Sequence, residues 1–360
     1  MLKRRSLKDI VPAAATGILL SAAFPGWNLE ALAWIAFLPL FYALEGKRPG
    51  EAFFLGFVSG LFFFFISLRW IIPTIVTYGK IPWFVGFGAF LLMTLILSVY
   101  PGIFAWGINR ALPGIPLPRE ITVPLLWTGL EFLRGHFFIP FPWLDLGYSQ
   151  YQNLPLIQIS DTASVYGVTF LILMVNRSLY EILAVFIFHG QGEKPGSPFH
   201  WRRPVGVFSV LILVLLYGSF RLSAPALPAQ KVRVAVVQGN IDQDRKWDES
   251  FRMEILKIYE SLTDEASKQY PDLILWPETA APFIYEKDSR FKDELNRYVR
   301  SLHMPLLTGA PSYVRGPEGV SWFNSAYLIN ADGIPDGRYD KINLVPFGEY
   351  VPFREILFFV

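Results

Sequence analysis

Two ionisable residues in the second half of the chain stand where α/β enzymes place reactive groups. Glu278 follows residues 271–276 (PDLILW), a run typical of a buried strand. Such sheets present catalytic groups at their strand ends, and a carboxylate there can accept a proton as a general base. Lys341 is followed by Ile342 and then by the mainly apolar residues NLVPF, and a fixed ammonium in a dry site can offset negative charge on a carbonyl oxygen. Both have structural alternatives: Glu278 as a helix cap, and Lys341 as a surface lysine paired with Asp336 or Asp340.

Composition limits the other chemistries open to the chain. The 360 residues contain no cysteine, which excludes disulfides and cysteine-ligated metals. The histidines are scattered without metal-ligand spacing, so we expect no metal. They are His136, His189, His200 and His303. We expect no other cofactor either. The net charge of +2 comes without a basic stripe interleaved with aromatics, and we therefore expect no nucleic-acid partner.

Alternating strands and helices are expected to position Glu278 and Lys341. Apolar, strand-like runs in the last third of the chain alternate with stretches whose apolar residues fall on one helical face. The strands are expected at 231–237, 271–276 and 304–308, the helices at 248–269 and 288–302, and a hairpin from 322 to 341. This order is typical of an α/β domain.

Charge density divides the chain into two parts that face different solvents. Hydrophobic residues make up 52% of the chain and charged residues 17%, against about 25% charged in ordinary soluble domains. Residues 1–230 hold 16 Lys+Arg and 10 Asp+Glu, whereas the shorter 231–360 holds 16 and 20. We therefore expect a membrane domain at 1–225 and a water-exposed domain at 226–360.

Seven apolar stretches of the first part are candidate transmembrane helices, because a helix needs about 20 mostly apolar residues to cross a bilayer. They lie at 9–26, 29–45, 51–72, 81–109, 120–135, 161–188 and 204–222. The fifth is the weakest, since Glu131 and Arg134 interrupt it, and a half-buried amphipathic helix is the alternative there.

Basic residues in the connecting loops predict the orientation of these helices. Eleven lie in the N-terminal segment and in alternate loops, which places those loops in the cytoplasm. They are Lys3, Arg4, Arg5, Lys8, Lys47, Arg48, Arg110, Arg119, Lys194, Arg202 and Arg203. Seven crossings from a cytoplasmic N-terminus put residues 226–360 on the extracytoplasmic face.

The segment at 136–160 is rich in aromatics and proline and holds no Lys or Arg. Aromatic side chains favour the membrane interface whatever the function. The segment is therefore either an aromatic belt on the outer interface or a lipid-handling surface, and Trp143 is its candidate substrate-binding residue.

Two motifs carry a resemblance to a known superfamily. Residues 274–280 (ILWPETA) resemble the glutamate motif of the nitrilase, or carbon–nitrogen hydrolase, superfamily, and residues 339–352 (YDKINLVPFGEYVP) resemble its lysine motif. Because the two motifs follow a multi-helix membrane part, the chain resembles the bacterial apolipoprotein N-acyltransferase family over nearly its whole length. The resemblance implies a multi-pass α-helical membrane domain in the bacterial inner membrane, followed by an α/β nitrilase-like domain, an αββα sandwich.

The resemblance also implies roles for particular residues. Glu278 would be the general base, Lys341 the oxyanion stabiliser, and Glu349 a second active-site carboxylate that holds Lys341 or tunes Glu278. A structural ion pair is the alternative for Glu349. Trp247 and Asn324 would contact substrate or its surroundings, with ordinary packing and turn roles as alternatives.

The implied reaction is acyl transfer through a cysteine thioester. The thiolate attacks an ester of a phospholipid donor, a lysophospholipid leaves, and the acyl chain passes to the N-terminal amine of S-diacylglyceryl-cysteine on an apolipoprotein. The implied partners are this phospholipid, the diacylglyceryl-modified apolipoprotein acceptor and the lipid bilayer.

The chain departs from this pattern at its nucleophile. The family's cysteine and a last membrane helix follow the lysine motif, whereas this sequence has no cysteine and stops at Val360. We therefore expect a fragment whose catalytic domain is incomplete at the C-terminus and which is inactive as given. The alternatives are a membrane-tethered amidase, whose tether needs one span rather than seven, and an inactive remnant that binds lipid or a partner.

Overall fold

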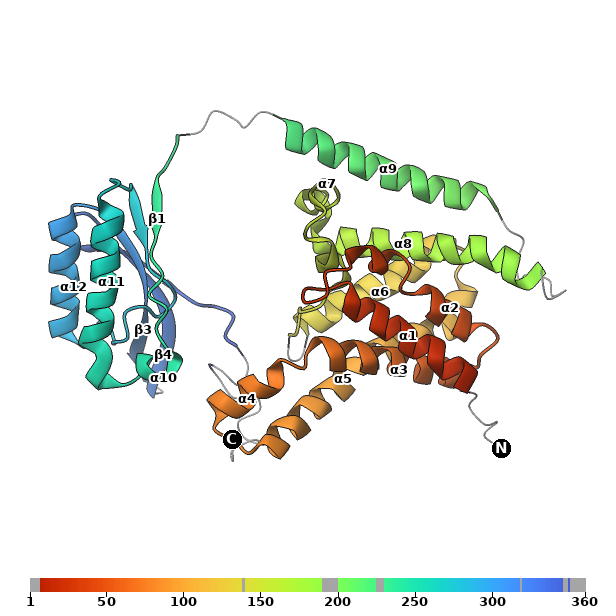
Figure 1. Cartoon of the computed structure of the whole chain (residues 1–360), viewed down its shortest axis with the longest axis horizontal. Helices are drawn as coiled ribbons and strands as arrows, with labels where there is room; N and C mark the ends of the chain where they lie inside the picture. The colour runs from red at the N-terminus through yellow and green to blue at the C-terminus, as the bar shows by residue number, and fades with distance from the viewer. Residues whose placement is uncertain are drawn as a thin grey trace. The chain divides into compact units, whose positions relative to one another are not determined.

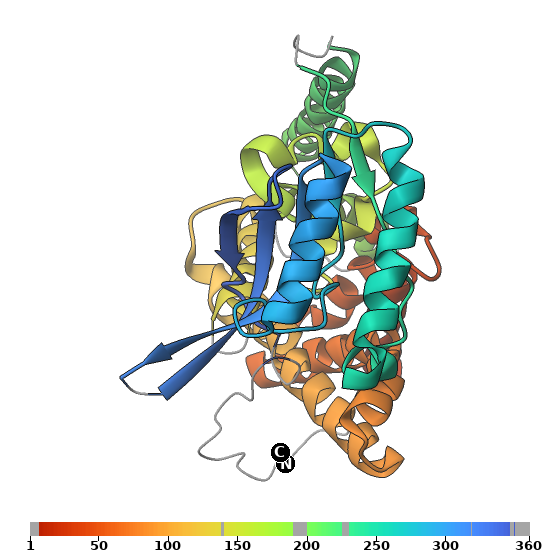
Figure 2. The ribbon, with the colours of Figure 1, turned by 90° about the vertical axis from the view of Figure 1, so that its left-hand side faces the viewer.

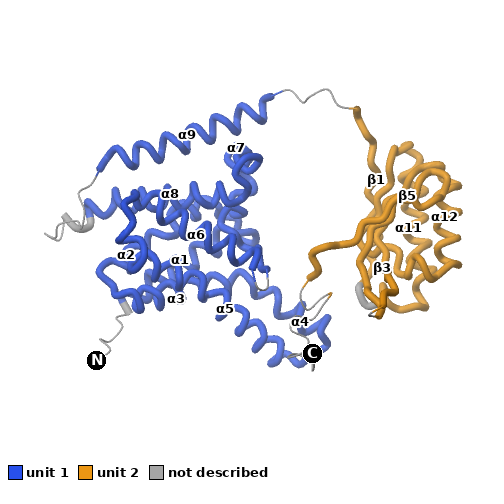
Figure 3. The backbone as a smooth tube through the Cα atoms, turned by 180° about the vertical axis from the view of Figure 1, so that it is seen from behind, with its two compact units in different colours: residues 1–225 blue, residues 226–360 orange. Residues whose placement is uncertain are grey.

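The computed structural model describes residues 7–137, 140–189, 200–224, 230–317, 319–345 and 349. The chain folds as two compact units, Met1–Pro225 and Ala226–Val360 (Figure 3). The described secondary structure of the first unit is helical throughout, and the second unit combines helices with one sheet.

Four helices of the first unit are long and apolar enough to cross a membrane, judged by length and composition. They are α3 (Pro49–Ser67), α5 (Trp83–Arg110), α8 (Ser160–His189) and α9 (Arg202–Ser223). The other helices are shorter or more polar: α1 (Leu7–Ala22), α2 (Leu38–Leu44), α4 (Ile71–Gly79), α6 (Arg119–His136) and α7 (Leu154–Ile157), with 3-10 turns η1 (Glu30–Trp34), η2 (Leu112–Gly114) and η3 (Leu146–Gln150). Seven membrane crossings therefore stay a prediction.

Prolines divide two of the expected continuous helices. The stretch 29–45 becomes η1 and α2, with Pro39 in the first turn of α2, and the stretch 51–72 gives α3 and then α4, with Pro73 in the first turn of α4. Proline lacks an N–H and disturbs a helix least in its first turn, although Pro12, Pro101 and Pro124 lie inside α1, α5 and α6. At the first break, the Asn176 side chain of α8 supplies hydrogen-bond partners for the backbone. It accepts from Phe37 N at 3.0 Å and donates to Ala33 O at 2.9 Å.

A single five-stranded sheet organises the second unit. Its strands are β1 (Val234–Val236), β2 (Leu273–Leu275), β3 (Leu306–Gly316), β4 (Gly319–Ile329) and β5 (Pro335–Asp340), in sequence order across the sheet. The first three are parallel, and β3, β4 and β5 are antiparallel neighbours. Helices α11 (Arg252–Ser267) and α12 (Ser289–Leu302) lie side by side on one face of the sheet (Figure 1). The short α10 (Gln243–Lys246) and η4 (Glu249–Phe251) precede α11.

The register sorts the strand residues onto two faces. Ile274 pairs with Leu306, which pairs with Ile329, and all three are fully buried in the core under α11 and α12. On the opposite face, Val236 and Trp322 are exposed. Among the described residues, the unit is therefore one sheet covered by helices on one face.

Strand β3 is longer than its sequence predicted. We expected a strand at 304–308, but β3 runs to Gly316 and pairs with β4 along its whole length, forming a hairpin whose far end extends beyond the helices (Figure 2). Pro311 lies in the middle of β3, and a proline is disfavoured in a central strand because it cannot donate to the ladder. The proline is tolerated because β2 pairs with β3 only at Leu306 and Leu307, so that β3 is no longer a central strand at Pro311.

Candidate active site

Glu278 lies in a loop that leaves the carboxyl end of β2 and packs directly on β3. Two backbone hydrogen bonds join the loop to β3. Trp276 N donates to Leu307 O at 2.8 Å, and Ala281 N donates to Gly309 O at 3.0 Å. A Cβ atom added to Gly309 would lie 2.8 Å from Glu278 Cα and closer still to the next backbone nitrogen. Only a glycine at 309 therefore lets the loop lie where it places the Glu278 carboxylate.

We expect Gly309→Ala to destabilise the second unit by about 1–3 kcal/mol, the usual range for overpacking against atoms that cannot give way. The matched control is Gly337→Ala in β5, where the nearest atom to an added Cβ lies at 3.8 Å. Thermal unfolding of the purified protein in detergent measures both. Equal stability of the two variants would show that the Glu278 loop moves freely away from β3.

Lys341 follows the last residue of β5 and is held by the backbone of β4, with Lys341 N donating to Asn324 O at 2.8 Å. The alternative pairing of Lys341 with Asp340 is not what the structure contains. Asp340 instead accepts from Arg338 Nε at 2.7 Å and from Ser325 Oγ at 2.6 Å. Because Asp340 is paired with these groups, the Lys341 ammonium can bind other carboxylates.

Four side chains that are distant in the sequence meet at one point. Lys341 Nζ lies 2.9 Å from Glu278 Oε1 and 3.0 Å from Glu349 Oε1. Asn324 Nδ2 donates to the same two oxygens, at 2.5 and 2.8 Å. Glu349 Oε2 also accepts from Val345 N at 2.8 Å. The result is one ammonium and one amide shared between two carboxylates.

Hydrogen bonds within this cluster shift the pKa values of Lys341 and Glu349 more than burial does. Partial burial by itself lowers the pKa of Lys341, but its bonds to Glu278 and Glu349 raise that pKa above the usual value overall. Burial by itself raises the pKa of Glu349, yet bonds from Asn324, Val345 N and Lys341 lower it overall. Lys341 is therefore a permanent cation at neutral pH and Glu349 a permanent anion. A carboxylate beside a fixed ammonium is an arrangement suited to proton transfer next to a developing oxyanion.

Lys246 is a further residue of the site, and the sequence alone had given it no role. Its Nζ donates to the main-chain oxygen of Glu278 at 3.1 Å, and burial lowers its pKa, with a smaller opposing effect from the Glu278 charge. Beside it lies a cavity of about 170 Å³ lined by Ile241, Lys246, Ile255, Tyr259, Pro277, Glu278 and Ala280. The signal in the sequence was that Lys246 and Trp247 together fit the resembled family.

The two tryptophans of the expected site lie in different units. Trp247 directly follows α10 and is more than half exposed. Trp143 belongs to the helical unit, where its ring centre lies 5.1 Å from that of Trp70. The described residues contain no group of three or more His, Cys, Asp or Glu side chains that could hold a metal ion.

Comparison with known proteins gives two matching family models. Residues 16–178 match the apolipoprotein N-acyltransferase N-terminal domain, and residues 233–360 match the carbon–nitrogen hydrolase family.

Individual relatives and solved structures are also similar to the chain. An apolipoprotein N-acyltransferase of Geobacter metallireducens is 41% identical over 98% of this chain and 67% of the relative. That of Azotobacter vinelandii is 31% identical over 96% and 64%. The chain thus spans about two thirds of the length of these relatives. Among solved structures, the NitN amidase of Neterenkonia sp. AN1 is 23% identical, covering 34% of this chain and 49% of the amidase with a TM-score of 0.28.

Proposed function

Because this chain belongs to the apolipoprotein N-acyltransferase family, we propose that it carries the membrane unit and the base and oxyanion groups of an enzyme that acylates lipoproteins. The acyl donor is a phospholipid, and the acceptor is the N-terminal amine of a diacylglyceryl-modified cysteine on an apolipoprotein. No metal or other cofactor takes part. The observation that carries the proposal is the convergence of Glu278, Lys341, Glu349 and Asn324 within hydrogen-bond distance.

In the first half-reaction, Glu278 takes the proton of a cysteine thiol, and the thiolate attacks the ester carbonyl carbon of the phospholipid. The carbonyl oxygen becomes negative and is stabilised by the Lys341 ammonium. The carbon–oxygen bond of the ester then breaks, and the lysophospholipid leaves with the proton that Glu278 held. An acyl thioester remains.

The second half-reaction uses the same groups on a different nucleophile. The α-amine of the acceptor attacks the thioester carbonyl, and Lys341 again faces the negative oxygen. Glu278 accepts the amine proton, and the carbon–sulfur bond breaks to release the thiolate, which recovers a proton from Glu278. Glu349 and Asn324 hold Lys341 and Glu278 in place through both halves.

The thiol of this scheme has to come from outside these 360 residues, which contain no cysteine. The decisive experiment therefore uses the full-length protein, read from the gene on both sides of this sequence. Incubated with phospholipid and a diacylglyceryl lipopeptide, it is expected to add one amide-linked acyl chain to the peptide, detected by mass spectrometry. A full-length protein with no cysteine, or one that leaves the peptide unchanged, would contradict the proposal.

We further propose that the N-terminus is cytoplasmic and the second unit extracytoplasmic, supported by the distribution of Lys and Arg in the loops. The four apolar helices and the family fit a bacterial inner-membrane protein.

Protease added to intact spheroplasts is accordingly expected to cleave within 230–345 and to spare the loops that carry the Lys and Arg residues. Immunoblotting with tags in the second unit and in the basic 194–203 loop measures both events. Lysed spheroplasts are the control in which the loops are cut as well. Protection of the second unit in intact spheroplasts would overturn the orientation.

A further inference from the structure

Three ionisable side chains lie buried together where α6 ends and the chain leads to η3. Glu131 and Arg134 belong to α6, Asp145 directly precedes η3, and each is at most 3% exposed. A buried charge is strongly destabilising unless it is paired and hydrogen-bonded, and ionisable residues inside a membrane bundle are candidates for a functional role. The acyl-transfer steps proposed above use none of the three.

The Glu131 carboxylate joins three elements through its hydrogen bonds. Oε1 accepts from Trp127 Nε1 at 2.7 Å and from Leu146 N at 2.8 Å, and Oε2 accepts from Thr169 Oγ1 at 2.9 Å. Thr169 in turn accepts from Gly147 N at 2.9 Å. One carboxylate therefore fixes the first residues of η3 against both α6 and α8.

Arg134 holds the chain on both sides of Trp143. Its Nη2 donates to Asp145 Oδ1 at 2.6 Å and to Trp143 O at 3.2 Å, and its own carbonyl accepts from Phe141 N at 2.9 Å. The guanidinium carbon also lies 5.4 Å from the centre of the Phe64 ring on α3. Because four contacts converge on one arginine, the backbone from 141 to 145 has little freedom to shift.

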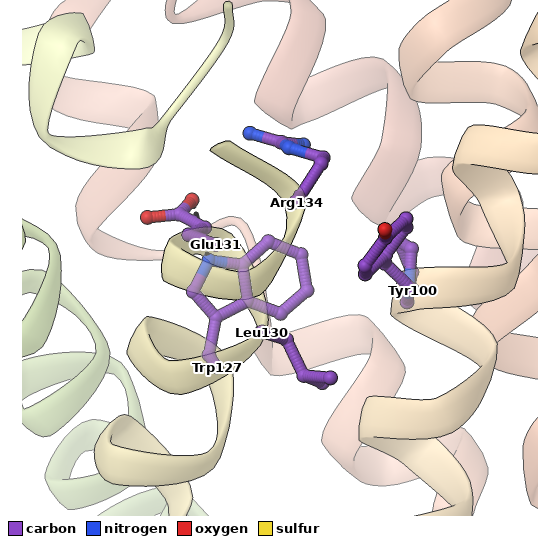
Figure 4. Close-up of a pocket in the computed structure, with 6 residues that line it drawn as sticks. Tyr100, Trp127, Leu130, Glu131 and Arg134 are labelled. Carbon is purple, nitrogen blue, oxygen red and sulfur yellow. Dashed lines mark hydrogen bonds between the residues drawn. The ribbon is translucent and has the colours of Figure 1, made fainter. Parts of the chain in front are cut away.

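The space beside the cluster is too small for a substrate. Figure 4 shows Glu131 and Arg134 leaving the same helix in different directions, with Tyr100 of α5 facing Arg134. The cavity that these residues line with Pro101, Trp127 and Leu130 measures about 10 Å³, which is about the room that one water needs. Arg134 Nε lacks a hydrogen-bond partner among the described residues, and such a water suits it. The cluster therefore acts on the chain around it and not on a ligand inside it.

The segment that the cluster holds carries Phe141 and Trp143, the second of which contacts Trp70 from the connection between α3 and α4. We define these three residues as the aromatic patch, in which Trp70 and Trp143 are exposed and Phe141 is half-buried. The ring centre of Trp143 lies 5.1 Å from Trp70 and 5.4 Å from Phe141, and about half of the Trp143 surface is exposed. Leu144 has a φ of +64°, a conformation that is rare for such a residue and persists only where the surroundings impose it. Exposed tryptophans of this kind favour lipid at the membrane interface.

We propose that Glu131, Arg134 and Asp145 are positioning residues, which fix the aromatic patch in the orientation that receives the acyl chains of the donor phospholipid. The proposal rests on the acyl transfer from phospholipid proposed above. It assigns the cluster to the binding of the lipid and not to the chemical step. Loss of the cluster therefore raises KM for the phospholipid and leaves kcat nearly unchanged.

The first test compares Arg134→Lys, Trp143→Ala and the double variant in the full-length protein, with phospholipid varied in mixed micelles. Lysine keeps the charge but does not bridge Asp145 and the Trp143 carbonyl together. We expect KM for the lipid to rise about ten-fold, as for one lost charge-assisted hydrogen bond, with kcat within about two-fold. The double variant is expected to match Trp143→Ala alone, because residues that act through one another are not additive. Arg177→Lys, a matched ion-paired arginine on α8, is expected to leave KM unchanged.

A second readout does not depend on activity. Brominated phospholipids quench tryptophan that lies against their chains, and the share due to Trp143 is the difference between wild type and Trp143→Phe. This share is expected to fall in Arg134→Lys and in the milder Asp145→Asn, which serves if Arg134→Lys does not fold. Unchanged quenching, additive effects on KM, or a loss confined to kcat would overturn the positioning role. A wild-type protein that shows Trp143 quenching but no transfer would instead contradict the proposed function alone.

Discussion

Glu278→Gln is expected to lower acyl transfer by the full-length protein about a thousand-fold or more. General-base catalysis contributes about 10²–10⁴-fold in a single step, and the proposed mechanism uses Glu278 in both half-reactions. Glutamine is nearly the same size, and its remaining oxygen can still accept from Lys341 and Asn324, which bond Glu278 Oε1 at 2.9 and 2.5 Å. The substitution therefore removes the proton acceptor while it preserves the geometry of the site.

The measurement separates the two halves of the reaction. Mass spectrometry of the protein after incubation with phospholipid reports the thioester, and the acylated lipopeptide reports the transfer. Both are expected to be lost in Glu278→Gln. Glu265→Gln is the control, since Glu265 is a surface carboxylate paired with Lys268, and it is expected to behave as wild type. Normal turnover in Glu278→Gln would remove this residue from the mechanism.

The helices and strands of the second unit were predictable wherever apolar residues recur in the sequence with a helical or strand period. The expected helix at 288–302 is α12 (Ser289–Leu302), and the expected strand at 271–276 contains β2 (Leu273–Leu275). Helical and strand periods are local properties, so a short window of sequence contains them. Local patterns were less informative at Pro311, because only the short pairing of β2 with β3 makes a proline acceptable in the middle of that strand.

The meeting of the site residues depends on sheet register, which the spacing of the sequence does not contain. Glu278 and Lys341 are 63 positions apart and follow β2 and β5, strands that are not neighbours in the sheet. They converge because β4 between them places Asn324 opposite Pro311, where its amide reaches both carboxylates. Only the resemblance of the two motifs to the carbon–nitrogen hydrolases indicated that the two residues belong together.

The buried cluster of the first unit could not be predicted from a short window of sequence either. In the sequence, Glu131 and Arg134 only weakened the case for a membrane helix at 120–135. Their partners, Asp145 and Thr169, lie 11 and 38 residues away from them. A window centred on α6 therefore shows the charges without the groups that neutralise or bond them.

Lys341→Met is expected to lower thioester formation about 10²–10³-fold, the usual effect of removing one preorganised oxyanion donor. The hydrogen bonds to Glu278 and Glu349 raise the pKa of this lysine, so the wild-type side chain carries its charge throughout the neutral range. Methionine has a similar length and no charge. Lys268→Met is the control, because Lys268 lies on the surface beside Glu265.

The pH profile of Lys341→Met distinguishes a site role from mere loss of packing. Lys341 is one of the groups that lower the pKa of Glu349, so its removal raises that pKa. Glu349 then becomes protonated over more of the acidic range, and the acid limb of the remaining activity is expected to move to higher pH. A simple packing defect lowers the rate without moving that limb. An undiminished acyl-enzyme signal, with the wild-type pH profile, would show that the negative oxygen is stabilised elsewhere and that Lys341 only neutralises its two neighbours.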